Sequence, residues 1–118
     1  MDGEVSWVIE VEVKAGRLEA FRALVDELVE STRKEPGTLA YSWFIGDDGK
    51  TVHVYERYAD SAATLLHVAT FGERFAERFL ELATPGRFHI YGTPSDAVRE
   101  ASAGLNPVYL GPLAGFAR

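Results

Sequence analysis

The ionisable side chains of this sequence limit the reactions that it can carry out. Its 118 residues include no cysteine, which excludes a thiolate nucleophile and a disulfide framework. No two of its histidines have the i, i+4 spacing of a helical metal site, so we expect no metal. Glu56 lies between Val54 and Tyr58 on one face of a predicted strand. A carboxylate among such neighbours needs polar partners, and it could orient a substrate hydroxyl or tie down the adjacent backbone. The histidines are His53, His67 and His89.

Several aromatic side chains have a spacing that would let them line a pocket for a flat substrate. Tyr41 and Trp43 share one face of a predicted strand and could stack on an aromatic ring. The same pair could equally serve as core or as part of a dimer interface. Phe71, Phe75 and Phe79 recur at helical spacing, which predicts core packing, and they could also wall an apolar pocket.

The hydrophobic pattern predicts the helices and strands that must position these residues. Alternating apolar residues indicate strands, and apolar residues three and four apart indicate helices. The predicted strands are 5–14, 38–45, 51–59 and 87–91, and the predicted helices are 17–33, 61–69, 71–82 and 94–104. With adjacent helices merged, this order is the split βαβ of a ferredoxin-like α+β fold. Its helices should cover one face of an antiparallel sheet.

Residues 1–92 are expected to form the main domain, and residues 93–118 to follow it as a C-terminal segment. Pro85 and Gly86 are predicted to form a turn before the fourth strand, and Pro94 to occupy the first position of the last helix. The remainder of residues 93–118 is a C-terminal helix and a tail. Because the stretch 106–113 is too apolar for a loose end, we expect it to dock, either on its own domain or across a dimer.

Both faces of the predicted sheet carry apolar or aromatic residues, which is unusual for a sheet with helices on one side. The strand 38–45 has Leu39 and Trp43 on one face and Phe44 on the other. A large exposed patch of this kind usually marks an interface. We therefore expect a homodimer in which two sheets pack face to face as a dimeric α/β barrel. Arg57 is expected to form a salt bridge at that interface.

The charge of the chain excludes several classes of partner. Its net charge is −6 and its pI about 5.0, without a basic cluster, so neither nucleic acid nor an anionic membrane surface is expected. The N-terminus lacks the basic and apolar regions of a signal peptide, and no apolar run is long enough to cross a bilayer. We therefore expect a cytoplasmic protein.

Three segments of the sequence resemble the antibiotic biosynthesis monooxygenases. In that family an E-P-G turn leads into a strand with a tyrosine, a second strand ends in E-R-W, and a short helix carries a histidine. The resemblance covers roughly residues 5–92. Two departures are Tyr58 in place of the usual tryptophan and the segment 71–75 in place of a second histidine region. The matching segments are Glu35-Pro36-Gly37-Thr38-Leu39-Ala40-Tyr41, Val54-Tyr55-Glu56-Arg57-Tyr58-Ala59-Asp60, and Ala62-Ala63 with His67.

The resemblance implies a homodimer with a pocket in each subunit between the sheet and its helices. Some family members oxygenate phenols or quinols with dioxygen alone, so it also implies a cofactor-independent monooxygenase acting on a quinol or polyketide-like aromatic. His67 is the matching histidine, and with a pKa near neutral it would take a proton from the substrate, with Glu56 as a second catalytic residue. The substrate-binding residues expected are Tyr41, Trp43, Tyr58, Phe71 and Phe75.

Other interpretations of the same scaffold stay open. One is a dimeric ligand-binding or structural module without catalysis. Another is haem degradation, for which Ser6 stands near the position where such enzymes carry an asparagine. His67 has an alternative of its own, because it lies off the apolar face of its predicted helix, beside Ala63 and Thr70. It would then be a surface or capping residue.

Overall fold

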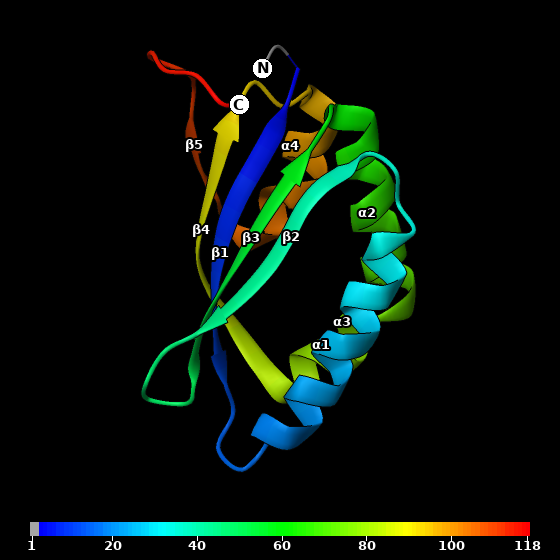
Figure 1. Ribbon diagram of the computed structural model, residues 1–118, viewed down its shortest axis with the longest axis vertical. Helices are drawn as coiled ribbons and strands as arrows, with labels where there is room; N and C mark the ends of the chain where they lie inside the picture. The colour runs from blue at the N-terminus through cyan, green and yellow to red at the C-terminus, as the bar shows by residue number, and fades with distance from the viewer. Residues whose placement is uncertain (1–2) are drawn as a thin grey trace.

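The computed structural model describes residues 3–118, and these form an α+β domain with the predicted ferredoxin-like topology (Figure 1). The helices α1, α2 and α3 cover one face of the sheet and leave the other face open (Figure 1). The elements in chain order are β1 (Val5–Val13), α1 (Leu18–Arg33), β2 (Thr38–Ile45), β3 (Thr51–Tyr58), α2 (Ser61–Arg74), α3 (Ala76–Leu82), β4 (Ala83–Gly92), α4 (Asp96–Ser102), the short 3₁₀ helix η1 (Ala103–Leu105) and β5 (Val108–Leu110).

The sheet has the strand order β2-β3-β1-β4-β5 and is open rather than closed into a barrel. Its central strand β1 pairs antiparallel with β3 and β4, and β2 pairs antiparallel with β3. The short strand β5 comes from the apolar tail and pairs parallel with β4. The sheet is therefore mixed, which corrects the predicted purely antiparallel sheet.

Burial follows a two-residue alternation along β3 and at both ends of β1. On β1, Val5, Trp7, Val11 and Val13 are buried beneath the helices, whereas Glu12 is exposed. The inward side chains form one hydrophobic cluster with α1 and α3 and a second cluster within the sheet around β1, β3 and β4. These two clusters pack the helices onto the sheet and so position the elements that carry the candidate site.

The prediction of a turn before the fourth strand is wrong, because Pro85 and Gly86 lie inside β4. The pairing of β4 with β1 shifts register between Ile9 and Val11, which marks a bulge opposite these residues. At the bulge the backbone of Gly86 approaches Glu10 so closely that a Cβ would lie 3.3 Å from the Glu10 carbonyl oxygen. A bulge tolerates proline within a strand because a ladder hydrogen bond is already lost there.

The start of α4 also differs from the prediction. Ser95, not Pro94, begins the helix as its N-cap, since its side chain accepts a hydrogen bond from the Val98 backbone N–H at 3.3 Å. Pro94 precedes the cap. Within residues 3–118, no helix combines the length and hydropathy needed to cross a membrane.

The open face of the sheet carries exposed aromatic residues and ion pairs formed within the chain. Phe44, Tyr55 and Tyr91 are 61%, 37% and 38% exposed. Arg57 donates two hydrogen bonds to Glu4 of the same chain, at 2.7 and 2.9 Å. The salt bridge expected of Arg57 at a dimer interface is therefore formed within the chain.

Candidate active site

The register of the sheet brings three side chains into one row on its inner face. Trp7 of β1 lies opposite Glu56 of β3, and Glu56 lies opposite Tyr41 of β2. Residues paired across a sheet project to the same face. The Glu56 carboxylate is therefore flanked by two aromatic side chains.

The turn between α1 and β2 brings a second carboxylate to α2. Gly37 packs so closely on α2 that a Cβ at this position would lie 2.5 Å from the Cβ of Ala63. No residue with a side chain fits there without a shift of the backbone. Since Ala63 precedes His67 by about one helical turn, this close approach places Glu35, at the start of the same turn, beside the His67 ring.

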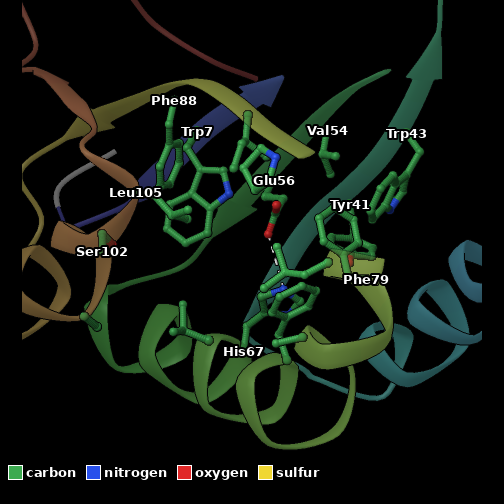
Figure 2. Close-up of a pocket in the computed structure, with 17 residues that line it drawn as sticks. Trp7, Tyr41, Trp43, Val54, Glu56, His67, Phe79, Phe88, Ser102 and Leu105 are labelled. Atoms are coloured by element: carbon green, nitrogen blue, oxygen red, sulfur yellow. Dashed lines mark ion pairs between the residues drawn. The ribbon is translucent and has the colours of Figure 1, made fainter. Parts of the chain in front are cut away.

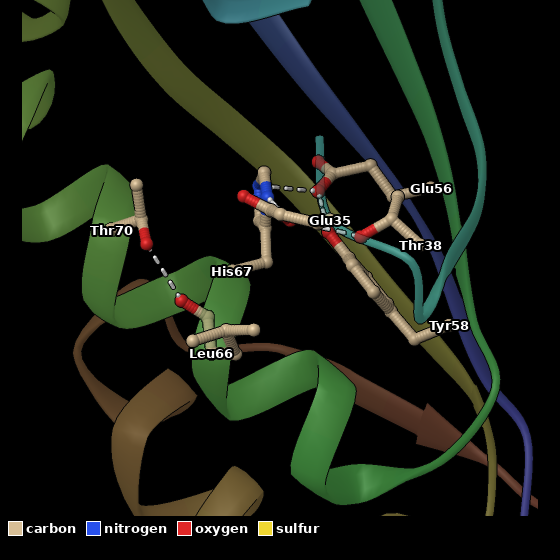
Figure 3. A network of polar contacts seen from close by, with 7 residues as sticks. All are labelled: Glu35, Thr38, Glu56, Tyr58, Leu66, His67 and Thr70. Atoms are coloured by element: carbon tan, nitrogen blue, oxygen red, sulfur yellow. Dashed lines mark hydrogen bonds and ion pairs between the residues drawn. The ribbon is translucent and has the colours of Figure 1, made fainter. Parts of the chain in front are cut away.

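His67 is held between the two carboxylates, and we call this group the Glu35–His67–Glu56 array (Figure 3). The His67 Nδ1 lies 2.9 Å from Glu35 Oε1, and its Nε2 lies 3.3 Å from Glu56 Oε1. Thr38 donates a hydrogen bond to Glu35 Oε1 at 2.9 Å, and the Tyr58 hydroxyl donates one to Glu56 Oε1. The side chains of His67, Glu35 and Glu56 are only 6%, 11% and 8% exposed.

The array changes the protonation of its members. Burial by itself would lower the pKa of His67, but the hydrogen bond and charge of Glu56, together with Glu35, outweigh burial and raise that pKa. The ring therefore keeps its second proton to higher pH than a free histidine, and both N–H groups can donate to carboxylates. Burial and the Glu56 charge also raise the pKa of Tyr41 and Tyr58 above their ordinary value, so both phenols stay protonated.

An apolar cavity of about 280 Å³ opens beside the array. Figure 2 shows Glu56 and His67 at the middle of the cavity, with Tyr41 and Trp43 toward one end and Trp7 toward the other. Ligand pockets typically combine an apolar wall with a few convergent polar groups. This cavity has that composition and a size suited to a small aromatic molecule.

The structure places five of the seven predicted site residues on the cavity wall. They are Tyr41, Trp43, Glu56, His67 and Phe71. Tyr58 is instead fully buried behind the wall, where it supports Glu56.

Phe75 packs in the core and does not line the cavity. The helical spacing predicted a break near residue 70 and a continuous helix over residues 71–82. The chain instead stays helical through Arg74 and leaves helical geometry at Phe75, with φ −127°, between α2 and α3. Its ring therefore leaves the line of Phe71 and Phe79, which contact each other with ring centroids 5.5 Å apart. The Arg74 and Arg78 guanidinium groups lie over Phe75 instead.

The interpretation of His67 as a surface or capping residue is wrong, because the residue is buried. The turn that contains Glu35 and Gly37 covers the side of α2 from which His67 projects. Leu66, on the face of α2 that the sequence predicts to be apolar, is 54% exposed. The apolar stripe of this short helix therefore predicted the wrong face of α2 to be buried.

Sequence reasoning missed Glu35 as a site residue and missed one wall of the cavity. Glu35 was visible only as part of a turn motif, although a glutamate directly before Pro36 and Gly37 was a usable signal. Ser102 and Leu105, which line the cavity from α4 and η1, lie in a segment to which the sequence assigns no role. Only the tertiary packing brings them to the site.

The geometry argues against haem degradation. Both ring nitrogens of His67 are engaged by carboxylates, so neither is free to bind iron. Ser6, the residue considered in place of an asparagine, pairs with Arg57 and Tyr91 in the sheet and shares their outer face. It therefore lies on the side of the sheet opposite the cavity.

Comparisons with known proteins agree with this fold. A family model described as antibiotic biosynthesis monooxygenase matches residues 5–76. MupZ from Pseudomonas fluorescens has a similar structure with a TM-score of 0.87 and 28% identity, covering 99% of this chain and 96% of that one. SnoaB from Streptomyces nogalater, a cofactor-independent oxygenase, also has a similar structure, with a TM-score of 0.67 and 17% identity. The match covers 79% of this chain and 95% of that one. Comparison with curated proteins finds no matching sequence.

The structural neighbours differ in how much of this chain they match. Protein SO0527 from Shewanella oneidensis, at a TM-score of 0.64 and 27% identity, covers 76% of this chain while 88% of its own chain is matched. SnoaB and SO0527 thus leave between about a fifth and a quarter of this chain unmatched, a share similar in size to the segment after β4. MupZ matches nearly the whole length.

Proposed function

This chain belongs to the antibiotic biosynthesis monooxygenase family, and from that premise we propose that it oxygenates a small quinol or polyketide-like aromatic with dioxygen and without a cofactor. The observation that carries the proposal is the buried Glu35–His67–Glu56 array in the middle of an apolar cavity. Such a reaction needs proton transfer at one point, a flat substrate held in one orientation, and exclusion of water.

The proton transfer is assigned to Glu56 rather than to His67 alone. The raised pKa of His67 favours the imidazolium, which holds a proton instead of removing one from a substrate. In the proposed reaction the substrate hydroxyl donates to the Glu56 carboxylate, which takes its proton. The imidazolium beside it offsets the negative charge that develops on the substrate oxygen.

Oxygen then enters at a carbon of the electron-rich anion. The anion gives one electron to dioxygen, and the substrate radical and superoxide combine into a peroxide anion. The peroxide takes the proton that Glu56 holds and becomes a hydroperoxide. Loss of water leaves one oxygen atom on the substrate carbon as a carbonyl, and the second oxygen leaves as water with the two hydrogens that the substrate loses. His67 is assigned the delivery of a proton to the departing oxygen, because its Nε2 already points to Glu56.

The aromatic walls are assigned the orientation of the substrate. Tyr41 contacts both the His67 ring and the Trp43 ring, with centroids 5.2 and 5.7 Å away and nearly perpendicular planes in the second pair. An aromatic substrate that stacks among these rings would present its hydroxyl to Glu56. Apolar surroundings also strengthen the electrostatic effect of the array.

We further propose that the chain forms a homodimer through the open face of its sheet. Phe44, Tyr55 and Tyr91 lie exposed on that face, and contiguous apolar surface of this kind usually marks an interface. Two such faces packed together would form the dimeric α/β barrel. Each cavity lies on the opposite side of its own sheet and stays accessible.

Oxygen consumption with a panel of naphthohydroquinones tests the proposed activity. The wild type is expected to exceed the rate in buffer, and Glu56→Gln and His67→Gln are expected to lose about 10²- to 10⁴-fold in kcat, the usual contribution of acid–base groups. His53→Gln is a matched control, because His53 also pairs with a glutamate, at 3.6 Å, but on the outer face. Its rate is expected to stay within about twofold of the wild type.

Two outcomes would count against this function. Equal rates for the wild type and both array variants would remove the array from catalysis and favour a ligand-binding module. Substrate conversion without oxygen consumption would exclude the oxygenase and leave a redox-neutral proton transfer at the same site.

A further inference from the structure

The C-terminal arm, defined here as residues 93–110, builds part of the cavity although the family match ends at residue 76. The arm contributes Ala101, Ser102 and Leu105 to the cavity wall. Figure 2 shows Ser102 and Leu105 near Trp7 and Phe88, at the end of the cavity away from Trp43. A substrate held at Glu56 would therefore extend toward the arm on one side.

The path of the arm is fixed where it leaves the sheet. Gly92 has φ +108°, and a Cβ there would lie 2.5 Å from the Glu4 carbonyl oxygen, so the exit from β4 requires glycine. The Ser95 backbone N–H then donates to the Ser61 hydroxyl at 3.0 Å, which ties the start of α4 to the start of α2. Val98 is 1% exposed and anchors α4 in the protein interior.

The arm is also fixed at its far end. Its strand β5 pairs with β4, as His89 with Val108 and Ile90 with Tyr109. The Arg99 guanidinium lies 4.0 Å from the centre of the Tyr109 ring, a cation–π contact that joins α4 to β5. With both ends held, the wall between them is preformed and does not need to be ordered by a ligand.

We infer that the C-terminal arm determines which substrates the cavity accepts, with Leu105 as the residue that limits substrate length beyond the Trp7 end. The substrate class assigned is a two-ring hydroxylated aromatic, because Leu105 and Ser102 line the end of the cavity near Trp7, where a longer ring system would meet them. The Ser102 hydroxyl adds one polar group to this apolar wall. This inference rests on the proposed function only in taking the cavity as the substrate site.

The side chain of Leu105 can be changed without disturbing the fold. It is 44% exposed, so it contributes to the cavity wall while one side faces solvent. Leu113 in the tail is a matched control, because it is the same residue type and is 99% exposed. Thermal unfolding of each variant checks that the domain remains folded.

Binding of 2-naphthol and 2-anthrol, which differ by one fused ring, tests the inference through the ratio of their Kd values. Leu105→Ala is expected to shift this ratio by about tenfold in favour of the three-ring probe, and Leu105→Trp by about tenfold against it, as for other changes of pocket volume. Leu113→Ala and Leu113→Trp are expected to leave the ratio unchanged. The fluorescence of the probes reports binding without any turnover.

A ratio that is the same in all five proteins would overturn the inference, as would failure of the wild type to bind either probe. Oxygen consumption decides the proposed function separately. A shifted ratio in proteins that never consume oxygen would support the arm as a specificity element and exclude the oxygenase. Oxygen consumption with an unshifted ratio of Kd values would support the oxygenase and overturn the inference about the arm.

Discussion

The two faces of strand β3 place the same residue types in opposite surroundings. Glu56 projects inward and pairs with His67, and the side chains of this pair are 8% and 6% exposed. His53 projects outward and pairs with Glu10 at 3.6 Å, and these side chains are 52% and 38% exposed. Both pairs join an imidazole to a carboxylate, yet only the inner pair belongs to a connected buried network.

Burial decides what each pair can do. Water and salt screen the charges of an exposed pair, whereas charges within a protein interior interact strongly and must be compensated there. The inner histidine has a second carboxylate, Glu35, and Glu56 has a hydroxyl donor, Tyr58. The difference teaches that composition alone does not make a reactive site, because the outer pair has the composition without the enclosure.

Replacing each histidine in turn by alanine is expected to give the largest difference between the two faces. His67→Ala leaves two buried carboxylates without their cation, so it should lower the free energy of unfolding by about 3–5 kcal/mol at pH 7. His53→Ala should lower it by only about 0–1 kcal/mol, the range of exposed ion pairs. Urea denaturation at one protein concentration measures both values. Similar losses for the two variants would show that the inner network is not held by charge.

The next largest effect is expected from a substitution on the outer face that weakens association of the proposed homodimer. Phe44→Asp places a charge in the proposed dimer interface and is expected to weaken association by about 2 kcal/mol or more, roughly thirtyfold. Leu66→Asp, at a residue of similar exposure on α2, is a matched control and should leave association unchanged. Analytical ultracentrifugation at micromolar concentration gives the mass. A wild-type monomer there would remove the homodimer and the barrel from the proposal.

Much of the fold could be predicted from the sequence because local patterns specify it. Alternation fixes β1, β2 and β3, and the strand bounds agree to within one residue. The element that escaped prediction, β5, has three residues and exists only through its pairing with β4. The bulge at Gly86 escaped for the same reason, since proline and glycine indicate a turn when the partner strand is unknown.

The candidate site could be predicted only in part. Glu56, Tyr41 and Trp43 follow from strand alternation, because a strand has one inward face. His67 and Glu35 do not, because their contact depends on Gly37 lying directly on Ala63. A contact between a turn and a helix that are far apart in the sequence leaves no periodic signal.

The smallest effect expected is the contribution of His67 to the pH dependence of stability. The raised pKa of His67 means that the folded chain binds its proton more tightly than the unfolded chain. This stabilisation is complete below the unfolded value of about 6.5 and is lost as pH rises through the folded pKa. Each unit of difference between the two values contributes about 1.4 kcal/mol.

Urea denaturation at increasing pH, starting at about pH 6, should therefore show stability falling in the wild type. His67→Gln should flatten that fall, because it removes the titrating ring while keeping a hydrogen-bonding side chain. His53→Gln should retain the wild-type slope. Comparing the two slopes cancels every other titrating group, so an equal slope in both variants would mean that burial lowers the pKa of His67 about as much as its two carboxylates raise it.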